Sequence, residues 1–395
     1  MDLKALQSKE IQAYILKHQD EDVAKLALKL GKEKHPFAAE ILNQVKGRQK
    51  AKQKIPQWLK EGILFPPTIS LEQCSSEQSA EFKTELITGK KLIDLSAGFG
   101  VDAYYFSKVF EEVILVEPNT ELIKVVEHNY SCFGIKNAAF ENIDAAGFLN
   151  SNTQKADWIY ADPSRRTDSN QKVYKFSDCQ PNIPELLPKL WEIAPNILIK
   201  AAPLLDIHAA MQELQYVKKA IVLSLNHEVK EVLYLLEQGF EGEEVIVAID
   251  LLKNSRNTFE FYFSQEKEAT FNLSFPQQYL YEPNAAILKA GAFKTIADKF
   301  GLKKLHPNSH LYTSDDLITD FPGRFFKVID TSKPDKKSLK QSLPGMKANV
   351  SLRNFHGSTS DFIKKTGIKE GGDIFLFATT LMDEKAVALI CEKLR

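Results

Sequence analysis

Four residues that suit ligand binding stand directly after short apolar runs of this chain. They are Gly98, Glu117, Asp144 and Asp162. The apolar runs predict buried strands, and the segments between them predict helices, an alternation typical of a mainly parallel sheet. Ligands of such sheets bind beyond the carboxyl ends of the strands. We therefore expect all four residues at one edge of one sheet.

The first of these positions is a glycine-rich turn. The run 91–95 predicts a strand and the apolar spacing over 101–109 predicts a helix, with Ser96, Gly98 and Gly100 between them. Glycine is needed there because a Cβ atom would keep a ligand away from the backbone. A tight turn without a ligand would use the same residues, so the turn alone leaves both interpretations open.

The acidic residues around this turn favour a cationic nucleoside as the ligand. Glu117 lies about 20 residues beyond the turn, the interval at which a carboxylate accepts both hydroxyls of a ribose. Asp94 lies inside the motif, where it would repel a pyrophosphate but attract an amino group and a sulfonium.

The segment Asp94-Leu95-Ser96-Ala97-Gly98-Phe99-Gly100 resembles the first motif of class I S-adenosylmethionine-dependent methyltransferases. The resemblance implies an α/β, Rossmann-like fold and S-adenosyl-L-methionine as the cofactor. It also implies that Glu117 binds the ribose and that Asp144, after the third strand, lies near the adenine. The expected cofactor-binding residues are Asp94, Ser96, Gly98, Gly100, Glu117 and Asp144.

The acceptor chemistry is expected after the fourth strand, at Asp162-Pro163-Ser164-Arg165. This segment resembles the Asp-Pro-Pro-Tyr motif of amino-group methyltransferases, in which the acidic residue accepts a hydrogen bond from the amine and the aromatic ring stacks on the base. Ser164 and Arg165 depart from that motif. Asp-Pro-x-Arg also resembles the fourth motif of 5-methyluridine RNA methyltransferases. The expected catalytic residues are Asp162, Pro163 and Arg165.

A missing cysteine restricts the atom that can be methylated. The 5-methyluridine enzymes need a cysteine nucleophile after the fifth strand, and Ala201 stands at that place. Without a thiolate, carbon 5 cannot be activated by covalent addition. The sequence therefore favours methyl transfer to a nitrogen or an oxygen.

Basic residues near this motif are candidate substrate contacts. Arg166 follows the motif and Lys200 ends the fifth strand, so the topology places both close to the cleft. Arg165 and Arg166 fit a phosphate clamp or a stack on a base. They fit equally an ion pair with Asp168 or Asp178, and these alternatives remain open.

The patterning divides the chain into four predicted segments. Residues 1–65 predict a helical N-terminal domain, and residues 66–253 predict the methyltransferase domain. Residues 254–323 predict a linker or ferredoxin-like α+β piece, and residues 324–395 a basic α+β domain. The methyltransferase strands are expected near 91–95, 113–117, 138–141, 157–161, 196–200, 219–225 and 243–251.

The last segment is strongly basic. Residues 324–369 carry 11 Lys and Arg against 3 Asp, or net +8, whereas the whole chain has net charge −1. This segregation suits an RNA-contacting appendage. The segments 347–356, which includes Arg353, and 376–380 resemble the THUMP-like domain found after some bacterial class I methyltransferases. The resemblance makes RNA the expected partner and Arg353 a candidate contact. Strands are expected at 325–329, 347–352 and 373–378, and helices at 358–365 and 384–394.

Three other sequence features indicate the partners and the cellular environment to expect. The run 46–54 has five basic residues and no acidic one, which fits either a solvated helix face or a phosphate-contacting surface. The four cysteines show no metal-like or disulfide-like spacing, so we expect a reducing cytoplasm and no metal. No apolar run is long enough to span a bilayer and residues 1–4 lack an apolar signal region, so no membrane contact is expected.

Together these patterns predict a methyltransferase that acts on a nitrogen or oxygen of a nucleotide in structured RNA, either tRNA or rRNA. Two alternatives stay open. One is an RNA-binding protein that keeps a cofactor pocket without turnover, and the other is a small-molecule methyltransferase.

Overall fold

The computed structural model describes residues 3–165 and 175–394, and the chain forms two compact units. One unit comprises Met1–Lys218 and Leu233–Glu241. The other comprises Lys219–Val232 and Gly242–Arg395.

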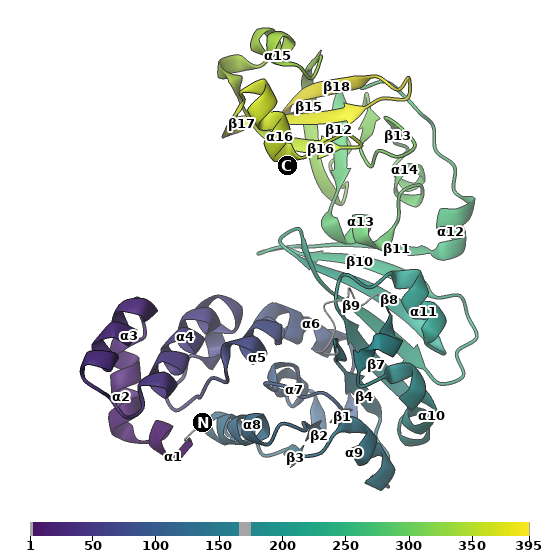
Figure 1. Ribbon diagram of the computed structural model, residues 1–395. Helices are drawn as coiled ribbons and strands as arrows, with labels where there is room; N and C mark the ends of the chain where they lie inside the picture. Colours follow the sequence, from purple (N-terminus) through teal and green to yellow (C-terminus); the bar gives the residue numbers. More distant parts are fainter. Residues whose placement is uncertain (1–2, 166–174, 395) are drawn as a thin grey trace. The chain divides into compact units, whose positions relative to one another are not determined.

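Short helices build the first part of the first unit (purple to blue in Figure 1). They are α1 (Leu3–Leu6), α2 (Lys9–His18), α3 (Val23–Lys32), α4 (Ala38–Lys54), η1 (Pro56–Trp58), α5 (Thr68–Gln73) and α6 (Glu77–Leu86). Ser8, Asp22 and Ser76 begin α2, α3 and α6, because their side chains accept hydrogen bonds from backbone N–H groups of the first helical turn.

The basic run at residues 46–54 lies on α4 and is engaged within this unit. Four of its five basic residues bond to neighbours: Arg48 to Gln19, Lys50 to Glu72, Lys52 to Asp20 and Lys54 to the carbonyl of Leu71. Arg48 is buried. These contacts tie the run to neighbouring segments of the same unit, and both interpretations of its composition stay predictions.

A parallel sheet forms the core of the first unit. Its strands β1 (Gly89–Asp94), β2 (Phe110–Val116), β3 (Ala138–Glu141), β4 (Trp158–Ala161) and β7 (Asn196–Ala201) lie in the order β7-β4-β1-β2-β3. Each neighbouring pair is parallel. Most of their residues are buried because helices cover both faces of the sheet, as Figure 1 shows. The predicted α/β, mainly parallel fold is confirmed.

Helices connect these parallel strands. They are α7 (Val101–Phe106), α8 (Thr120–Phe133), α9 (Ala145–Ser151), α10 (Ile183–Ile193) and α11 (Ile207–Glu213). A small two-stranded sheet of β5 (Ser164–Arg165) and β6 (Cys179–Gln180), with η2 (Phe176–Asp178), follows β4. Asn119 caps α8 by accepting hydrogen bonds from the N–H groups of Glu121 and Leu122, both at 3.1 Å.

The second unit holds two groups of strands. In the first group, β8 (Val217–Leu225) is parallel to β10 (Val245–Leu251), and β10 is antiparallel to β11 (Arg256–Tyr262). β9 (Glu228–Glu237), which was not expected from the sequence, follows β8 after a turn at Asn226 and His227 with φ of 49° and 67°, and its residues 233–237 belong to the first unit.

The second group is a seven-stranded sheet in the order β13-β14-β12-β15-β18-β17-β16. Its strands are β12 (Tyr279–Pro283), β13 (Lys303–Lys304), β14 (Tyr312–Ser314), β15 (Gly323–Ser332), β16 (Lys347–Arg353), β17 (Lys369–Thr380) and β18 (Ala386–Lys393). The helices of this unit are α12 (Phe263–Glu268), α13 (Ala285–Ala290), α14 (Thr295–Lys299), α15 (Lys336–Ser342), η3 (Pro344–Met346) and α16 (Thr359–Thr366). The strands expected at 325–329, 347–352 and 373–378 and the helix expected at 358–365 are present.

The helix expected at 384–394 is wrong, because this segment forms β18 between β15 and β17. Ala388 and Ile390 pack into one apolar cluster of the unit, and Leu389 and Cys391 pack into another. Successive residues of a strand point to opposite faces, so a central strand covered on both faces is apolar throughout. Such a run has no period that distinguishes it from a buried helix.

Candidate active site

The glycine turn joins β1 to α7. Gly98 and Gly100 have φ of +55° and +75°, a conformation that favours glycine. A Cβ on Gly100 would lie 2.8 Å from Cγ1 of Val126, so this glycine is required for packing against α8. At Gly98 the nearest atom to such a Cβ is the Ser96 carbonyl oxygen at 3.8 Å. The backbone at Gly98 therefore borders open space that a ligand can enter.

Glu117, directly after β2, is bonded to this turn. Its carboxylate accepts hydrogen bonds from the backbone N–H of Gly98 at 3.0 Å and of Asn119 at 2.9 Å. Burial raises the pKa of Glu117. Two acceptor lone pairs of the carboxylate remain for a ligand, as a ribose diol would need.

Asp94 is the most buried carboxyl group of the site. It is 1% exposed and accepts a hydrogen bond from the backbone N–H of Ser96 at 3.0 Å. Burial raises its pKa well above the usual range, and the nearby carboxylates of Asp102, Asp162 and Glu117 add to the shift. A cationic ligand at this turn would relieve that repulsion.

Ser96 connects the glycine turn to the predicted catalytic segment. Its hydroxyl accepts a hydrogen bond from the backbone N–H of Asp162 at 2.5 Å. A glycine at this position, as in dinucleotide-binding turns, would leave that N–H without this partner. The serine therefore fixes the start of the Asp162-Pro163 segment beside the turn.

Asp162 and Lys200 form an ion pair where β4 and β7 end. The Nζ atom of Lys200 donates to Oδ2 of Asp162. Lys200 is 9% exposed and Asp162 is half-buried, so the pair lies at the border between core and solvent. Two residues predicted separately, one as catalytic and one as a substrate contact, are thus in direct contact. Pro163 is buried beside them.

Asp144 has a structural role in its loop. Its carboxylate caps α9 by accepting a hydrogen bond from the backbone N–H of Gly147 at 2.7 Å. The neighbouring Asn142 donates to the carbonyl oxygens of Glu117 at 2.9 Å and Pro118 at 3.1 Å. These bonds hold the loop of Asp144 against the loop of Glu117.

Three predicted site residues remain: Arg165, Arg166 and Arg353. Arg165 lies in β5, and Arg166 lies outside the described residues. Arg353 belongs to the second unit, where its guanidinium is bonded to Glu282.

A buried polar network beside the site was missed by the sequence analysis. The Asp102 carboxylate, at the start of α7, accepts hydrogen bonds from Ser75 Oγ at 2.7 Å, Tyr160 Oη at 2.8 Å and Lys83 Nζ at 3.1 Å. Lys83 is 0% exposed. Burial alone raises the pKa of Asp102, but Lys83, Lys200 and the two hydroxyl donors outweigh it and lower the pKa to about 2. The network links the segment before α6 to α7 and β4.

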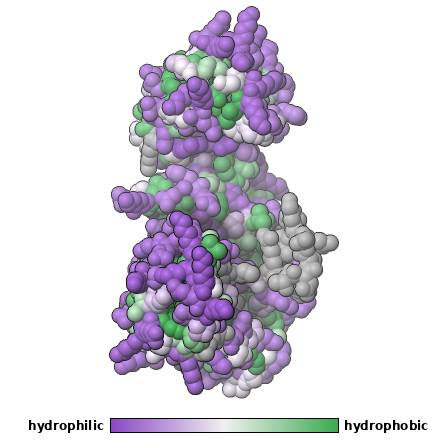
Figure 2. Space-filling view, turned by 60° about the vertical axis from the view of Figure 1, so that its left-hand side comes forward, coloured by the Kyte–Doolittle hydropathy of each residue, from purple (hydrophilic) through white to green (hydrophobic). Residues whose placement is uncertain are grey.

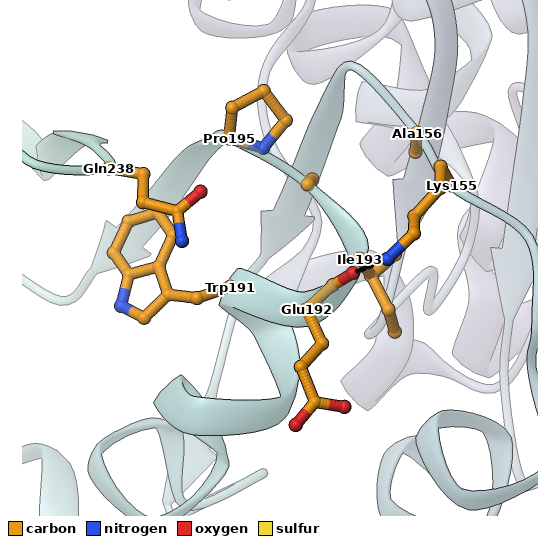
Figure 3. Close-up of a pocket in the computed structure, with 8 residues that line it drawn as sticks. Lys155, Ala156, Trp191, Glu192, Ile193, Pro195 and Gln238 are labelled. Carbon is orange, nitrogen blue, oxygen red and sulfur yellow. Dashed lines mark hydrogen bonds between the residues drawn. The ribbon is translucent and has the colours of Figure 1, made fainter.

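A surface pocket of about 260 Å³ lies at the other ends of the strands (Figure 3). It is lined around the segments that precede β4 and β7, among others by Lys155, Trp191, Glu192 and Gln238. None of the predicted site residues lines it. The site described above is therefore not this pocket.

The residues present fit S-adenosylmethionine. Open backbone at Gly98, a carboxylate with free lone pairs at Glu117 and the buried Asp94 suit a ligand with a ribose and cationic groups. Gly98, Glu117, Asp94 and Asp162 all follow or end strands of one parallel sheet, at its carboxyl edge. The fold and this site define a class I S-adenosylmethionine-dependent methyltransferase.

Comparisons with known proteins agree with this class. The crystal structure of a methyltransferase candidate from Porphyromonas gingivalis W83 is 30% identical over the full length of both chains, with a TM-score of 0.87. An uncharacterised S-adenosylmethionine-dependent methyltransferase of Mycobacterium tuberculosis H37Rv is 19% identical over 277 residues, 70% of this chain and 73% of the relative. The chain belongs to the methyltransferase family of the Porphyromonas gingivalis protein, and its cofactor is S-adenosylmethionine.

Two family models match the second unit. A ferredoxin-like domain matches residues 279–322, and a THUMP-like domain matches residues 323–393. The predicted resemblance to methyltransferases with a THUMP-like C-terminal domain is confirmed.

The described residues contain neither a membrane-spanning helix nor a metal-binding group of side chains. None of the helices at residues 3–165 and 175–394 is long and apolar enough to cross a membrane. Within the same residues, no group of three or more His, Cys, Asp or Glu side chains is arranged to hold a metal ion.

Proposed function

We propose that this enzyme methylates a nitrogen or oxygen atom of a nucleotide in structured RNA, either tRNA or rRNA. The observation that carries the proposal is the Asp162–Lys200 pair at the carboxyl ends of β4 and β7, tied to the glycine turn through Ser96. It offers a carboxylate and an ammonium group to one acceptor beside the cofactor-binding turn.

The chemistry of these groups suits an acceptor that is already nucleophilic. When bound, S-adenosylmethionine supplies an electrophilic methyl group on a sulfonium. The Asp162 carboxylate can accept a hydrogen bond from the attacking N–H or O–H group and orient its lone pair. Lys200 holds that carboxylate in place until an acceptor displaces its ammonium group.

Cys74, whose thiol pKa is affected by Asp162 and Lys200, does not offer the covalent route to carbon 5. Burial raises the pKa of Cys74 to about 11, although Lys54 and Lys200 oppose the shift. A thiol with that pKa is protonated at neutral pH and is a poor nucleophile. Ala201, at the end of β7, carries no nucleophile. Both observations support a nitrogen or oxygen acceptor.

RNA as substrate is supported by the second unit. This unit contains the THUMP-like segment and the basic residues of 324–369. Figure 2 shows hydrophilic side chains over most of its visible surface, at the top of the view. Clustered lysine and arginine gain free energy on a nucleic acid backbone through counterion release.

The test is transfer of tritium from labelled S-adenosylmethionine to total RNA of a strain that lacks the gene. We expect label in RNA with the wild type and at least about a hundredfold less with Asp162→Asn, because the acceptor loses its hydrogen-bonding carboxylate. Glu192→Gln, an equal change of charge at the pocket of Figure 3, is the matched control and retains the wild-type rate.

Three outcomes would contradict the proposal. Cofactor uptake by calorimetry without label in any RNA indicates an RNA-binding protein without turnover. Label only in low-mass metabolites indicates a small-molecule methyltransferase. Equal rates for Asp162→Asn and wild type would remove Asp162 from the mechanism.

A further inference from the structure

A buried glutamate in the second unit is held between two arginines. Glu282, on β12, has a side chain that is 4% exposed. Its Oε2 accepts hydrogen bonds from Nε of Arg324 at 2.9 Å and from Nη2 of the same residue. Its Oε1 accepts from Nε of Arg353 at 2.8 Å and lies 2.7 Å from Nη2 of Arg353. We call these three residues the Arg-Glu-Arg cluster.

The cluster has one positive charge in excess. No other carboxylate lies within 4.0 Å of either guanidinium among the residues that the structure describes. The side chains of Arg324 and Arg353 are 29% and 38% exposed, so both reach solvent. Several N–H donors of the two guanidinium groups remain outside the bonds to Glu282, since each group has five.

The two guanidinium groups are also fixed in orientation. Arg324 lies over the rings of Phe326 and Phe375, with its Cζ 5.6 and 5.9 Å from their centroids. Arg353 additionally donates from Nη1 to the carbonyl oxygen of Leu352 at 2.8 Å. Pre-oriented arginine donors bind a tetrahedral oxyanion with little further loss of side-chain entropy.

The charge of Arg353 affects the pKa of one histidine of this unit, His310. The ring of His310 stacks on Phe293 at 3.7 Å, and its Nδ1 is buried without a hydrogen-bond partner among the described residues. Burial lowers the pKa of His310 to about 4, and the charges of Lys304 and Arg353 contribute. Asn284, two residues after Glu282, is 4% exposed and has a buried Nδ2 atom that likewise lacks a partner within the described chain.

A purely structural role for the Arg-Glu-Arg cluster would not require its second arginine. Glu282 belongs to the ferredoxin-like segment and both arginines belong to the THUMP-like segment, so the cluster does join the two. One arginine is sufficient to neutralise one buried carboxylate. The second arginine makes the cluster cationic, in a unit whose residues 324–369 are already strongly basic. This excess of charge is not needed to neutralise Glu282, whereas an anion site requires it.

We propose that the Arg-Glu-Arg cluster binds a phosphate group of the RNA backbone. The inference rests on the proposed function, because RNA supplies the phosphate. Glu282 acts as a positioning residue that orients both guanidinium groups, and the oxyanion accepts their remaining N–H donors. The site would anchor the RNA through its backbone rather than read its bases.

The test compares single variants of the full chain in binding to fluorescein-labelled bulk tRNA at several salt concentrations. Arg353→Gln and Arg324→Gln each leave a neutral pair with Glu282, so we expect about tenfold weaker binding and a salt slope lower by about one. Arg353→Lys keeps the positive charge but loses the paired N–H donors of the guanidinium group. It should weaken binding less than Arg353→Gln does. Lys267→Gln removes one exposed charge of the same unit, on α12 and outside residues 324–369, and serves as the matched control, with binding within about twofold of wild type.

A second measurement uses inorganic phosphate and the NMR signals of the His310 ring, assigned with His310→Gln. Phosphate should shift these signals in the wild type and leave them unchanged in Arg353→Gln. Thermal unfolding of each variant checks that the second unit stays folded.

Two results would contradict the proposal that the Arg-Glu-Arg cluster binds a phosphate group. One is equal loss of RNA binding in Lys267→Gln and Arg353→Gln, which would assign the effect to the overall charge of the unit. The other is a wild type that binds tRNA while phosphate leaves His310 unchanged. If the wild type binds S-adenosylmethionine but no RNA, the proposed function fails, and a phosphate-dependent shift of His310 that Arg353→Gln abolishes would still support a phosphate site.

Discussion

Removal of Lys83 should destabilise the first unit by leaving Asp102 charged and buried. Lys83 is fully buried and donates from Nζ to Asp102, to Ser75 Oγ at 3.1 Å and to the carbonyl oxygen of Ser79 at 3.3 Å. In Lys83→Met the carboxylate loses its cation but remains out of water. Breaking a buried pair in this way costs about 3–5 kcal/mol of unfolding free energy.

The pKa of Asp102 gives an independent estimate. It is lowered from 3.8 to about 2 in the folded chain, and each pKa unit corresponds to about 1.4 kcal/mol. The ionised carboxylate therefore stabilises the fold by about 2 kcal/mol, an effect that is complete above pH 4 and is lost as the pH falls toward 2. In Lys83→Met, burial acts unopposed by that lysine and the pKa rises. The difference between variant and wild type should thus be largest at neutral pH and shrink as the pH falls through the raised pKa of Asp102 in the variant and on toward 2.

The assay is urea unfolding followed by tryptophan fluorescence. All three tryptophans, Trp58, Trp158 and Trp191, lie in the first unit, so the signal reports on the unit that contains the pair. The double variant Lys83→Met with Asp102→Asn removes both charges. It should recover at least about 2 kcal/mol relative to Lys83→Met, because no ionised group is then left unpaired.

Two results would refute this reasoning. A Lys83→Met variant as stable as the wild type would mean that the pair contributes nothing. A double variant no more stable than Lys83→Met would mean that the loss comes from packing rather than from an unpaired charge.

Two further predictions concern cofactor binding by calorimetry. Gly100→Ala should weaken uptake of S-adenosylmethionine more than tenfold, because the new Cβ would meet Val126. Gly134→Ala is the control: Gly134 has the same φ of +75°, but its new Cβ would lie in open space. This substitution should cost only about 1 kcal/mol of unfolding free energy. Affinity should fall as the pH is lowered, because the carboxyl groups of Asp94 and Glu117 have raised pKa values and a cation binds their ionised forms. Binding should therefore release protons, measured as a dependence of the heat on the buffer. Unchanged affinity for Gly100→Ala, or heats independent of buffer, would contradict these predictions.

The sheet and the position of the site could be predicted because they follow from local patterns. Each apolar run of the first unit formed the strand it predicted, and the carboxyl ends of parallel strands meet at one edge. That rule brought Gly98 and Glu117 into direct contact, as it did Asp162 and Lys200. The long-range contacts depended only on strand direction and order.

The Asp102 network could not be predicted in the same way. Lys83 and Asp102 are 19 residues apart on two helices, and neither position differs in sequence from an ordinary solvent-facing one. A lysine in a helix is usually exposed, whereas Lys83 is fully buried. The burial of Arg48 was likewise not predicted, because a run of basic residues does not indicate which of its side chains are buried.

The distribution of cations among the carboxylates distinguishes the glycine turn from the rest of the site. Asp102 and Asp162 are paired with Lys83 and Lys200. No Lys, Arg or His side chain within the described residues lies within 4.0 Å of Asp94 or Glu117, and these are the two whose pKa values are raised. The two carboxyl groups without a cationic partner thus both lie at the glycine turn, on the residues expected to contact the cofactor. A cation bound there completes the set of pairs, so cofactor binding and the stability of this edge of the sheet should rise together.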